Sequence, residues 1–169
     1  MAAKRHKTKL GDVFRIPLSE NESGFGQIIA DDSEGILLMV IFDHRTRNCD
    51  SPELTDIVAS EPLFISDSVD AKIWHGDWPI VGNMPPDLER FPLPNYRVDI
   101  NGVTYVESYY GDRIRPATAA EFTKLSPRGS RAPIRLENAL KAYYGFIEWD
   151  DSFDELTADV AFRSATIDV

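Results

Sequence analysis

The sequence has few of the residues that build metal sites and nucleophilic centres. It contains one cysteine, Cys49, and three histidines, His6, His44 and His75, which lie far apart in the chain. A single cysteine cannot form an internal disulfide, which is typical of proteins from a reducing compartment. The histidines do not show the spacing of metal ligands, and a structural zinc site usually needs more cysteines. We therefore expect a cytoplasmic protein that has no metal and no cofactor.

Long apolar runs and common catalytic motifs are also missing. The longest apolar run, GILLMVIF at Gly35 to Phe42, has the length of a strand and is far shorter than the roughly 18 residues of a membrane span. The basic start of the chain leads into no apolar segment, so we predict no secretory signal. GFG at Gly24 to Gly26 lacks the third glycine of a dinucleotide loop, and no GxxxxGK[ST], HExxH or GxSxG motif occurs.

Basic residues are scarce and unevenly placed. The chain has 18 Lys and Arg against 28 Asp and Glu, a net charge of -10. Four of the basic residues lie within residues 1–9, and without them the net charge is -14. An acidic body repels nucleic acid phosphates and anionic membranes, so we expect neither as a partner, and it attracts a basic partner. The alternative is that the charge serves only solubility.

Three β-rich runs at the start of the chain predict the first part of an α+β fold. They are Lys9–Leu18, Gly24–Ala30 and Ile36–Phe42, and short polar turns separate them. The third run is apolar throughout, which indicates a strand that is covered on both faces. Short strands with tight turns predict a curled antiparallel sheet or a small, partly open barrel.

The middle of the chain predicts shorter elements. Ser51-Pro52 is typical of a helix start, and this helix would end near Ser60. We further expect a strand at Leu63–Ile65 and a short helix at Asp67–His75 that stops at Gly76. Five prolines between residues 79 and 94 predict an extended loop that packs on the sheet.

The last third carries the clearest local signals. Asn101-Gly102 between two β-rich runs predicts a hairpin, because both residues tolerate positive φ. Thr118 and Glu121 have the spacing of a capping box, which predicts a helix to about Leu125. A second helix is expected from Pro133 to Tyr144. We divide the chain into a basic, flexible stretch (1–8), one α+β domain (9–150) and an acidic extension (151–169) that is partly disordered at its end.

The helix from Pro133 to Tyr144 has the pattern of a docking helix. Its apolar face is formed by four residues at helical spacing: Leu136, Ala139, Leu140 and Tyr143. Glu137 and Lys141 form an i, i+4 pair on another face. Arg131 and Arg135 lie near the helix start, where the helix dipole disfavours positive charge, so each needs a carboxylate or carbonyl partner.

Two groups of residues could support chemistry, and each has a simpler interpretation. Asp43-His44 follows the apolar strand and could serve a small hydrolase or nucleotide-processing enzyme with nearby carboxylates. The simpler interpretation is that the pair caps the strand end. Glu148, Asp150 and Asp151 could hold a metal or act as an acid and base, but a solvated acidic face is the better explanation.

Six segments in order resemble the immunity protein 26 family of bacterial polymorphic toxin systems, over roughly residues 9 to 149. They are KLGDVFRIPL, GFGQII, the strand end at Phe42-Asp43, WPIVGNMP, RIRPAT with Arg113 and Arg115, and APIRLENALKAYYG with Arg135, Glu137 and Tyr143. The resemblance implies a cytoplasmic protein without catalytic residues that binds a toxin and covers or flanks its active site. The family helix is then chiefly structural.

The charge adds a hypothesis to this resemblance. An acidic immunity protein suits a toxin with a basic surface, such as a nuclease. Its interface would combine acidic side chains with aromatic anchors. The candidates are Glu20, Glu22, Asp31, Asp32, Glu34, Glu148, Trp149, Asp150 and Asp151. The hydrolase described above remains the alternative, and so does a module that binds a basic peptide of the host.

Overall fold

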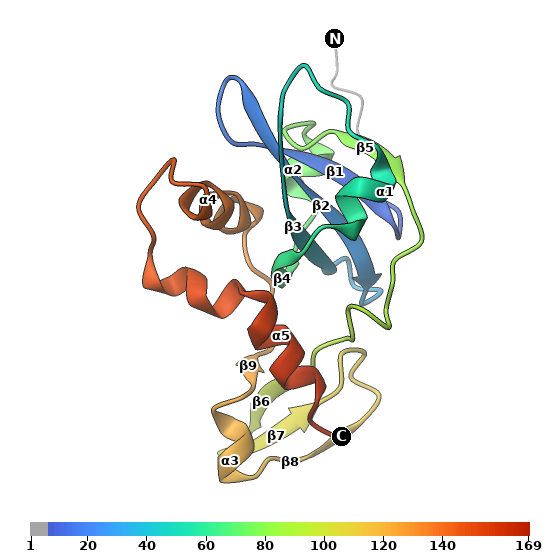
Figure 1. Cartoon of the computed structure of the whole chain (residues 1–169). Helices are drawn as coiled ribbons and strands as arrows, with labels where there is room; N and C mark the ends of the chain where they lie inside the picture. Colours follow the sequence, from blue (N-terminus) through green and yellow to red (C-terminus); the bar gives the residue numbers. More distant parts are fainter. Residues whose placement is uncertain (1–6) are drawn as a thin grey trace.

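Two β-sheets lie at opposite ends of the computed structural model, and a C-terminal helix runs between them (Figure 1). The structure describes residues 7–169. The five-stranded sheet has the order β4-β3-β2-β1-β5 and the four-stranded sheet the order β8-β7-β6-β9. The strands are β1 (Asp12–Pro17), β2 (Glu22–Asp31), β3 (Leu37–Arg47), β4 (Pro62–Ser68), β5 (Ile80–Asn83), β6 (Tyr96–Ile100), β7 (Val103–Glu107), β8 (Ile114–Pro116) and β9 (Ser126–Pro127).

The first sheet is antiparallel throughout and open. The two predicted polar turns join β1, β2 and β3. The register shifts locally in three strand pairs, β1–β5, β2–β3 and β3–β4. β4 and β5 form the two edges, so the sheet does not close into a barrel. Leu37 to Phe42 are all buried, which confirms that this part of β3 is covered on both faces.

Six short helices accompany the sheets in the described part of the chain. They are α1 (Leu54–Ala59), α2 (Ala71–Trp74), α3 (Ala119–Phe122), α4 (Pro133–Tyr143), the 3-10 helix η1 (Asp151–Leu156) and α5 (Ala158–Ala165). The capping box of α3 and the docking helix α4 are confirmed, and Gly145 ends α4 at φ 79°. The hairpin at Asn101-Gly102 is also confirmed, with φ 50° and 79°.

Several predicted boundaries are wrong, mostly because strand pairing extends further than the local patterns indicate. β3 continues to Arg47, so Asp43 and His44 lie inside the strand. The helix predicted at Asp67–His75 shrinks to α2, because Asp67 pairs with Leu38 in β3 and belongs to β4.

The other differences concern helix ends. α1 begins at Leu54 with Glu53 as its N-cap, so Ser51-Pro52 only precedes it. α3 ends at Phe122, because the chain then turns to pair β9 with β6 in parallel. Residues 151–169 contain η1 and α5. The loop with five prolines includes β5, which pairs with β1.

Apolar side chains pack on both faces of the first sheet. One cluster joins one face of the sheet to α4 through Leu136 and Leu140, and includes Phe153 and Leu156 of η1. The second cluster lies on the other face and includes Ala158 and Ala161 of α5. Gly24 permits the close approach of α4, since a Cβ there would lie 2.5 Å from Leu140 Cδ2.

None of the helices in residues 7–169 is long and apolar enough to cross a membrane.

Candidate functional site

The acidic residues of the two hairpin turns lie at opposite ends of β2. Glu20 and Glu22 are at its start, and Asp31, Asp32 and Glu34 are at its end. Ten strand residues span about 30 Å at roughly 3.3 Å each, so the two groups are too far apart to form one compact site. Glu22 is also engaged, with an oxygen 3.5 Å from Arg45 Nε.

Asp43 and His44 do not form a joint site. Neighbouring residues of a strand point to opposite faces of the sheet, and each of these two has its own partners. The Asp43 carboxylate accepts hydrogen bonds from the hydroxyls of Tyr143 at 3.0 Å and Tyr144 at 2.8 Å. His44 Nδ1 lies 2.9 Å from Ser60 Oγ. Asp43 therefore ties the end of α4 to β3.

Trp149 is both exposed and held in place. It is 42% exposed, and its ring stacks on Phe64 at 6.3 Å between centroids and meets Phe153 edge-on at 5.5 Å. Its Nε1 donates a hydrogen bond of 3.0 Å to Asp154. An aromatic ring that is fixed on three sides before a partner arrives loses little conformational entropy on binding.

Two adjoining hollows lie beside Trp149. The first has a volume of about 200 Å³, and its lining includes Leu63, Phe64, Tyr143, Trp149 and Asp159. The second, of about 420 Å³, shares Asp159 and Thr157 with the first. It is also lined by Asp154, Phe162 and Arg163. We call the two hollows with the adjacent exposed residues 146–151 the Trp149 surface.

Acidic side chains surround this surface. Glu148, Asp150 and Asp151 are exposed next to Trp149 in sequence, and Asp154 and Asp159 line the hollows. The hydrogen bond from Ser152 to the side chain of Asp150 lowers the pKa of that carboxyl. Aromatic and apolar groups thus meet a negatively charged rim.

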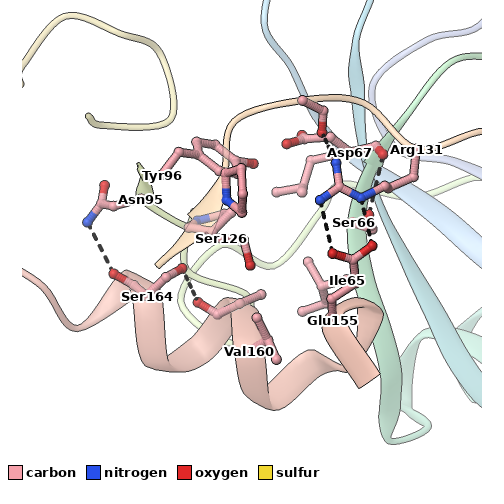
Figure 2. Close-up of a pocket in the computed structure, with 15 residues that line it drawn as sticks. Ile65, Ser66, Asp67, Asn95, Tyr96, Ser126, Arg131, Glu155, Val160 and Ser164 are labelled. Carbon is pink, nitrogen blue, oxygen red and sulfur yellow. Dashed lines mark hydrogen bonds and ion pairs between the residues drawn. The ribbon is translucent and has the colours of Figure 1, made fainter. Parts of the chain in front are cut away.

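Two arginines fix the position of η1, which carries part of this surface. Arg131 Nε lies 3.2 Å and Arg135 Nη1 2.8 Å from Glu155 Oε1, and Arg135 also donates to the Ser152 carbonyl at 2.8 Å. Figure 2 shows Arg131 reaching Glu155 above α5. Burial raises the pKa of Glu155, but the hydrogen bonds from both arginines bring it below its ordinary value. These are the carboxylate and carbonyl partners that the sequence required.

The remaining family-motif residues hold the fold together. Arg115 makes a two-point contact with Glu121, at 2.9 and 2.7 Å, and also donates to the Asp168 carbonyl. The hydrogen bond from Arg115 lowers the pKa of Glu121 to about 2. Arg113 donates to the carbonyl of Val169 at 3.3 Å. Arg115 in β8 and Arg113 just before it therefore connect this part of the chain to its last residues.

A second polar region lies between the two sheets. It was not predicted from the sequence. Asp67, at the end of β4, is 7% exposed, and burial raises its pKa to about 6 despite the lowering effects of the Tyr96 hydroxyl and Arg128. Burial also raises the pKa of Tyr96 and Tyr109. Figure 2 shows Asp67 beside Arg131 and Tyr96 nearer to Ser126. The local pattern placed Asp67 in a helix, so nothing in the sequence indicated this site.

Within residues 7–169, no group of three or more His, Cys, Asp or Glu side chains is placed to hold a metal ion. The geometry of the described residues offers two features of functional interest. They are the acid-rimmed Trp149 surface and the polar region between the sheets.

A sequence model of one protein family, described as Immunity protein 26, matches residues 9–101. The chain belongs to the immunity protein 26 family. The match covers the whole first sheet and reaches the β6–β7 hairpin. The six sequence segments that resemble the family extend further, to residue 149. Neither the curated proteins nor the solved structures contain a match.

Proposed function

We propose that this protein binds a cognate bacterial toxin and neutralises it by covering or flanking the toxin's active site. The observation that carries the proposal is membership of the immunity protein 26 family over residues 9–101. In this function the protein acts in the cytoplasm by binding alone, without turnover. The separate engagement of Asp43 and His44 supports a binding protein over a hydrolase.

The Trp149 surface has the composition of an interface centre. Binding energy usually concentrates on a few buried aromatic anchors that are surrounded by a polar rim. Here Trp149 and Tyr143 are 42% and 46% exposed beside a hollow, and Phe146 and Ile147 add exposed apolar area. We place the toxin on this surface, with Trp149 as its main anchor.

The charge of the chain supports a basic toxin surface, such as that of a nuclease. The net charge is -10, and the rim of the Trp149 surface is acidic. Complementary charge accelerates association, and salt screens the effect over about 8 Å at physiological ionic strength. The association rate constant should therefore fall as salt rises. A rate that is insensitive to salt would exclude electrostatic steering, although not toxin binding itself.

The direct test is co-expression with the neighbouring gene. The gene immediately upstream is expressed in a susceptible host with and without this protein, and the two products are then purified together. We expect toxicity that this protein relieves, together with a stable complex. Toxicity without relief, or a relieved toxicity without a complex, would contradict neutralisation by direct binding.

A further inference from the structure

Three buried polar atoms between the sheets have no hydrogen-bond partner within residues 7–169. They are Asp67 Oδ1 and the hydroxyl oxygens of Tyr96 and Tyr109, on side chains that are at most 7% exposed. The Tyr96 hydroxyl lies close enough to the Asp67 carboxyl to lower its pKa. A buried polar group without a hydrogen-bond partner destabilises the fold, and an ionised one does so more strongly. Unsatisfied groups that line one pocket indicate a ligand that would satisfy them.

Two of these groups, Asp67 and Tyr109, line a pocket of about 300 Å³, and Tyr96 is not among its lining residues. Four carboxylates line it, those of Asp32, Glu34, Asp67 and Glu107, and the basic side chain among its described lining residues is Arg128. A pocket of this volume is at the lower end of the range for small-molecule sites. Asp67 and Gly129 also line a smaller hollow of about 30 Å³, which Tyr96 and Arg131 border (Figure 2).

Arg128 offsets only part of the negative charge of this pocket, because it stands against four carboxylates and is already paired with one of them, Glu107. Its guanidinium pairs with Glu107, donates to the carbonyls of Ser108 and Tyr109, and lies over the Tyr96 ring at 4.5 Å. Arg131 is similarly paired with Glu155. Within the described part of the chain, the carboxylates of Asp32, Glu34 and Asp67 therefore face the pocket without an ion-pair partner.

We propose that this pocket binds an organic cation, a guanidinium or primary ammonium group at the end of a flexible chain. Such a group supplies donors for Asp67 and for the Tyr109 hydroxyl, and its charge offsets that of Asp32 and Glu34. The rings of Tyr109 and Tyr110, edge-to-face at 4.9 Å, add aromatic surface for cation–π contact. The site shares no lining residue with the hollows of the Trp149 surface.

The same chemistry has two sources, a free small amine and a lysine or arginine side chain of a protein partner. The first experiment tests the cation site itself with a probe compound, so the natural source of the cation need not be known. The protein is titrated at pH 7.5 with butylguanidinium and, separately, with butylurea, a neutral compound of nearly the same shape. Amide chemical shifts are followed by two-dimensional NMR. We expect saturable shifts with butylguanidinium around residues 32–36, 67 and 107–111, and at least tenfold weaker binding of butylurea.

Variants decide whether the binding belongs to this pocket. Asp67→Asn keeps the shape of the side chain and should weaken butylguanidinium at least tenfold. Tyr109→Phe, which removes only a hydroxyl, should weaken it less and provides a second variant if the first is unstable. Glu20→Gln, at the far end of β2, should bind as the natural protein does. Shifts scattered over the acidic surface, equal binding of butylurea, or equal binding by Asp67→Asn and Glu20→Gln would overturn the proposal.

A second experiment identifies the source once a toxin complex has been isolated. If a toxin side chain occupies the pocket, the complex no longer responds to butylguanidinium and Asp67→Asn weakens toxin binding. If the ligand is a free amine, butylguanidinium binds the complex and the free protein equally well. Both outcomes support a cation site, and only the butylguanidinium titration of the free protein can overturn it. Failure of toxin binding is thus distinguishable from failure of this site.

Discussion

The indole Nε1 of Trp78 donates a hydrogen bond of 3.0 Å to the carboxylate of Glu137, deep between α4 and the first sheet. Trp78 is fully buried and stacks on Phe14 at 5.3 Å between ring centroids. Glu137 also receives Lys141 Nζ at 2.6 Å and lies 3.6 Å from Lys72 Nζ. The expected i, i+4 pair of Glu137 and Lys141 is therefore present, but Glu137 is buried. Through Trp78, Glu137 joins the docking helix to the part of the chain that the family model covers.

Replacing Glu137 should destabilise the fold. Glu137→Ala leaves the buried Trp78 indole without an acceptor and should lower the free energy of unfolding by about 2–3 kcal/mol, as measured by urea denaturation. Glu137→Gln keeps an acceptor and should cost less. Burial raises the pKa of Glu137, but its hydrogen bonds bring the pKa below the ordinary 4.5. Its ionised form thus stabilises the fold above pH 4.5, and this contribution is lost as the pH falls through the folded-state pKa. Equal stability of Glu137→Ala and the natural protein at pH 7 would contradict this role.

The contact between Gly24 and Leu140 should appear as coupling between two substitutions. Gly24→Ala forces a methyl group into Leu140 and should cost about 1–3 kcal/mol of unfolding free energy. Leu140→Ala removes a fully buried side chain and should cost about 2–5 kcal/mol. Because the shorter side chain at position 140 makes room for the new methyl group, the double variant should cost less than the sum. If the two changes in unfolding free energy simply add in the double variant, as measured by urea denaturation, α4 does not pack against Gly24.

Asp67 should make the protein less stable as the pH rises. Its pKa of about 6 in the folded state exceeds the ordinary 3.8, so protonation favours the folded form. This contribution is complete below pH 3.8 and is lost as the pH rises through 6, by about 3 kcal/mol at most. The difference in unfolding free energy between Asp67→Asn and the natural protein should therefore shift in favour of the variant from about pH 4 to about pH 7.5. A difference that is the same at both values would contradict the raised pKa.

Trp149 should dominate toxin affinity. Trp149→Ala should weaken the complex by about 2 kcal/mol or more, roughly 30-fold in Kd, by calorimetric titration. Phe122 is a suitable control, because it is 44% exposed and lies on α3 outside the Trp149 surface. Phe122→Ala should leave the affinity unchanged. Circular dichroism establishes that both variants are folded, and equal affinities would move the interface elsewhere.

Local sequence patterns predicted local structure well, whereas contacts between distant segments were harder to predict from the sequence. Asn101-Gly102 and the Thr118–Glu121 capping box each specify their own backbone, so both elements could be predicted. The sequence also indicated that Arg135 needs a partner. It could not indicate that this partner is Glu155, because their contact depends on how η1 packs against α4. Asp67 became a site residue only because two separate sheets enclose it. Trp149 as a toxin contact stays a prediction.

The C-terminal segment contributes to all three apolar clusters of the described chain. Leu156 belongs to the first cluster, Ala161 to the second and Ile167 to the third. Asn95, in the connection between the sheets, donates to the Ile167 carbonyl at 2.7 Å. A polypeptide released from the ribosome before Phe153 would leave apolar surface uncovered on both faces of the first sheet. Such a product should be open to proteolysis, so a frameshift that removes residues 153–169 should sharply lower the amount of folded protein.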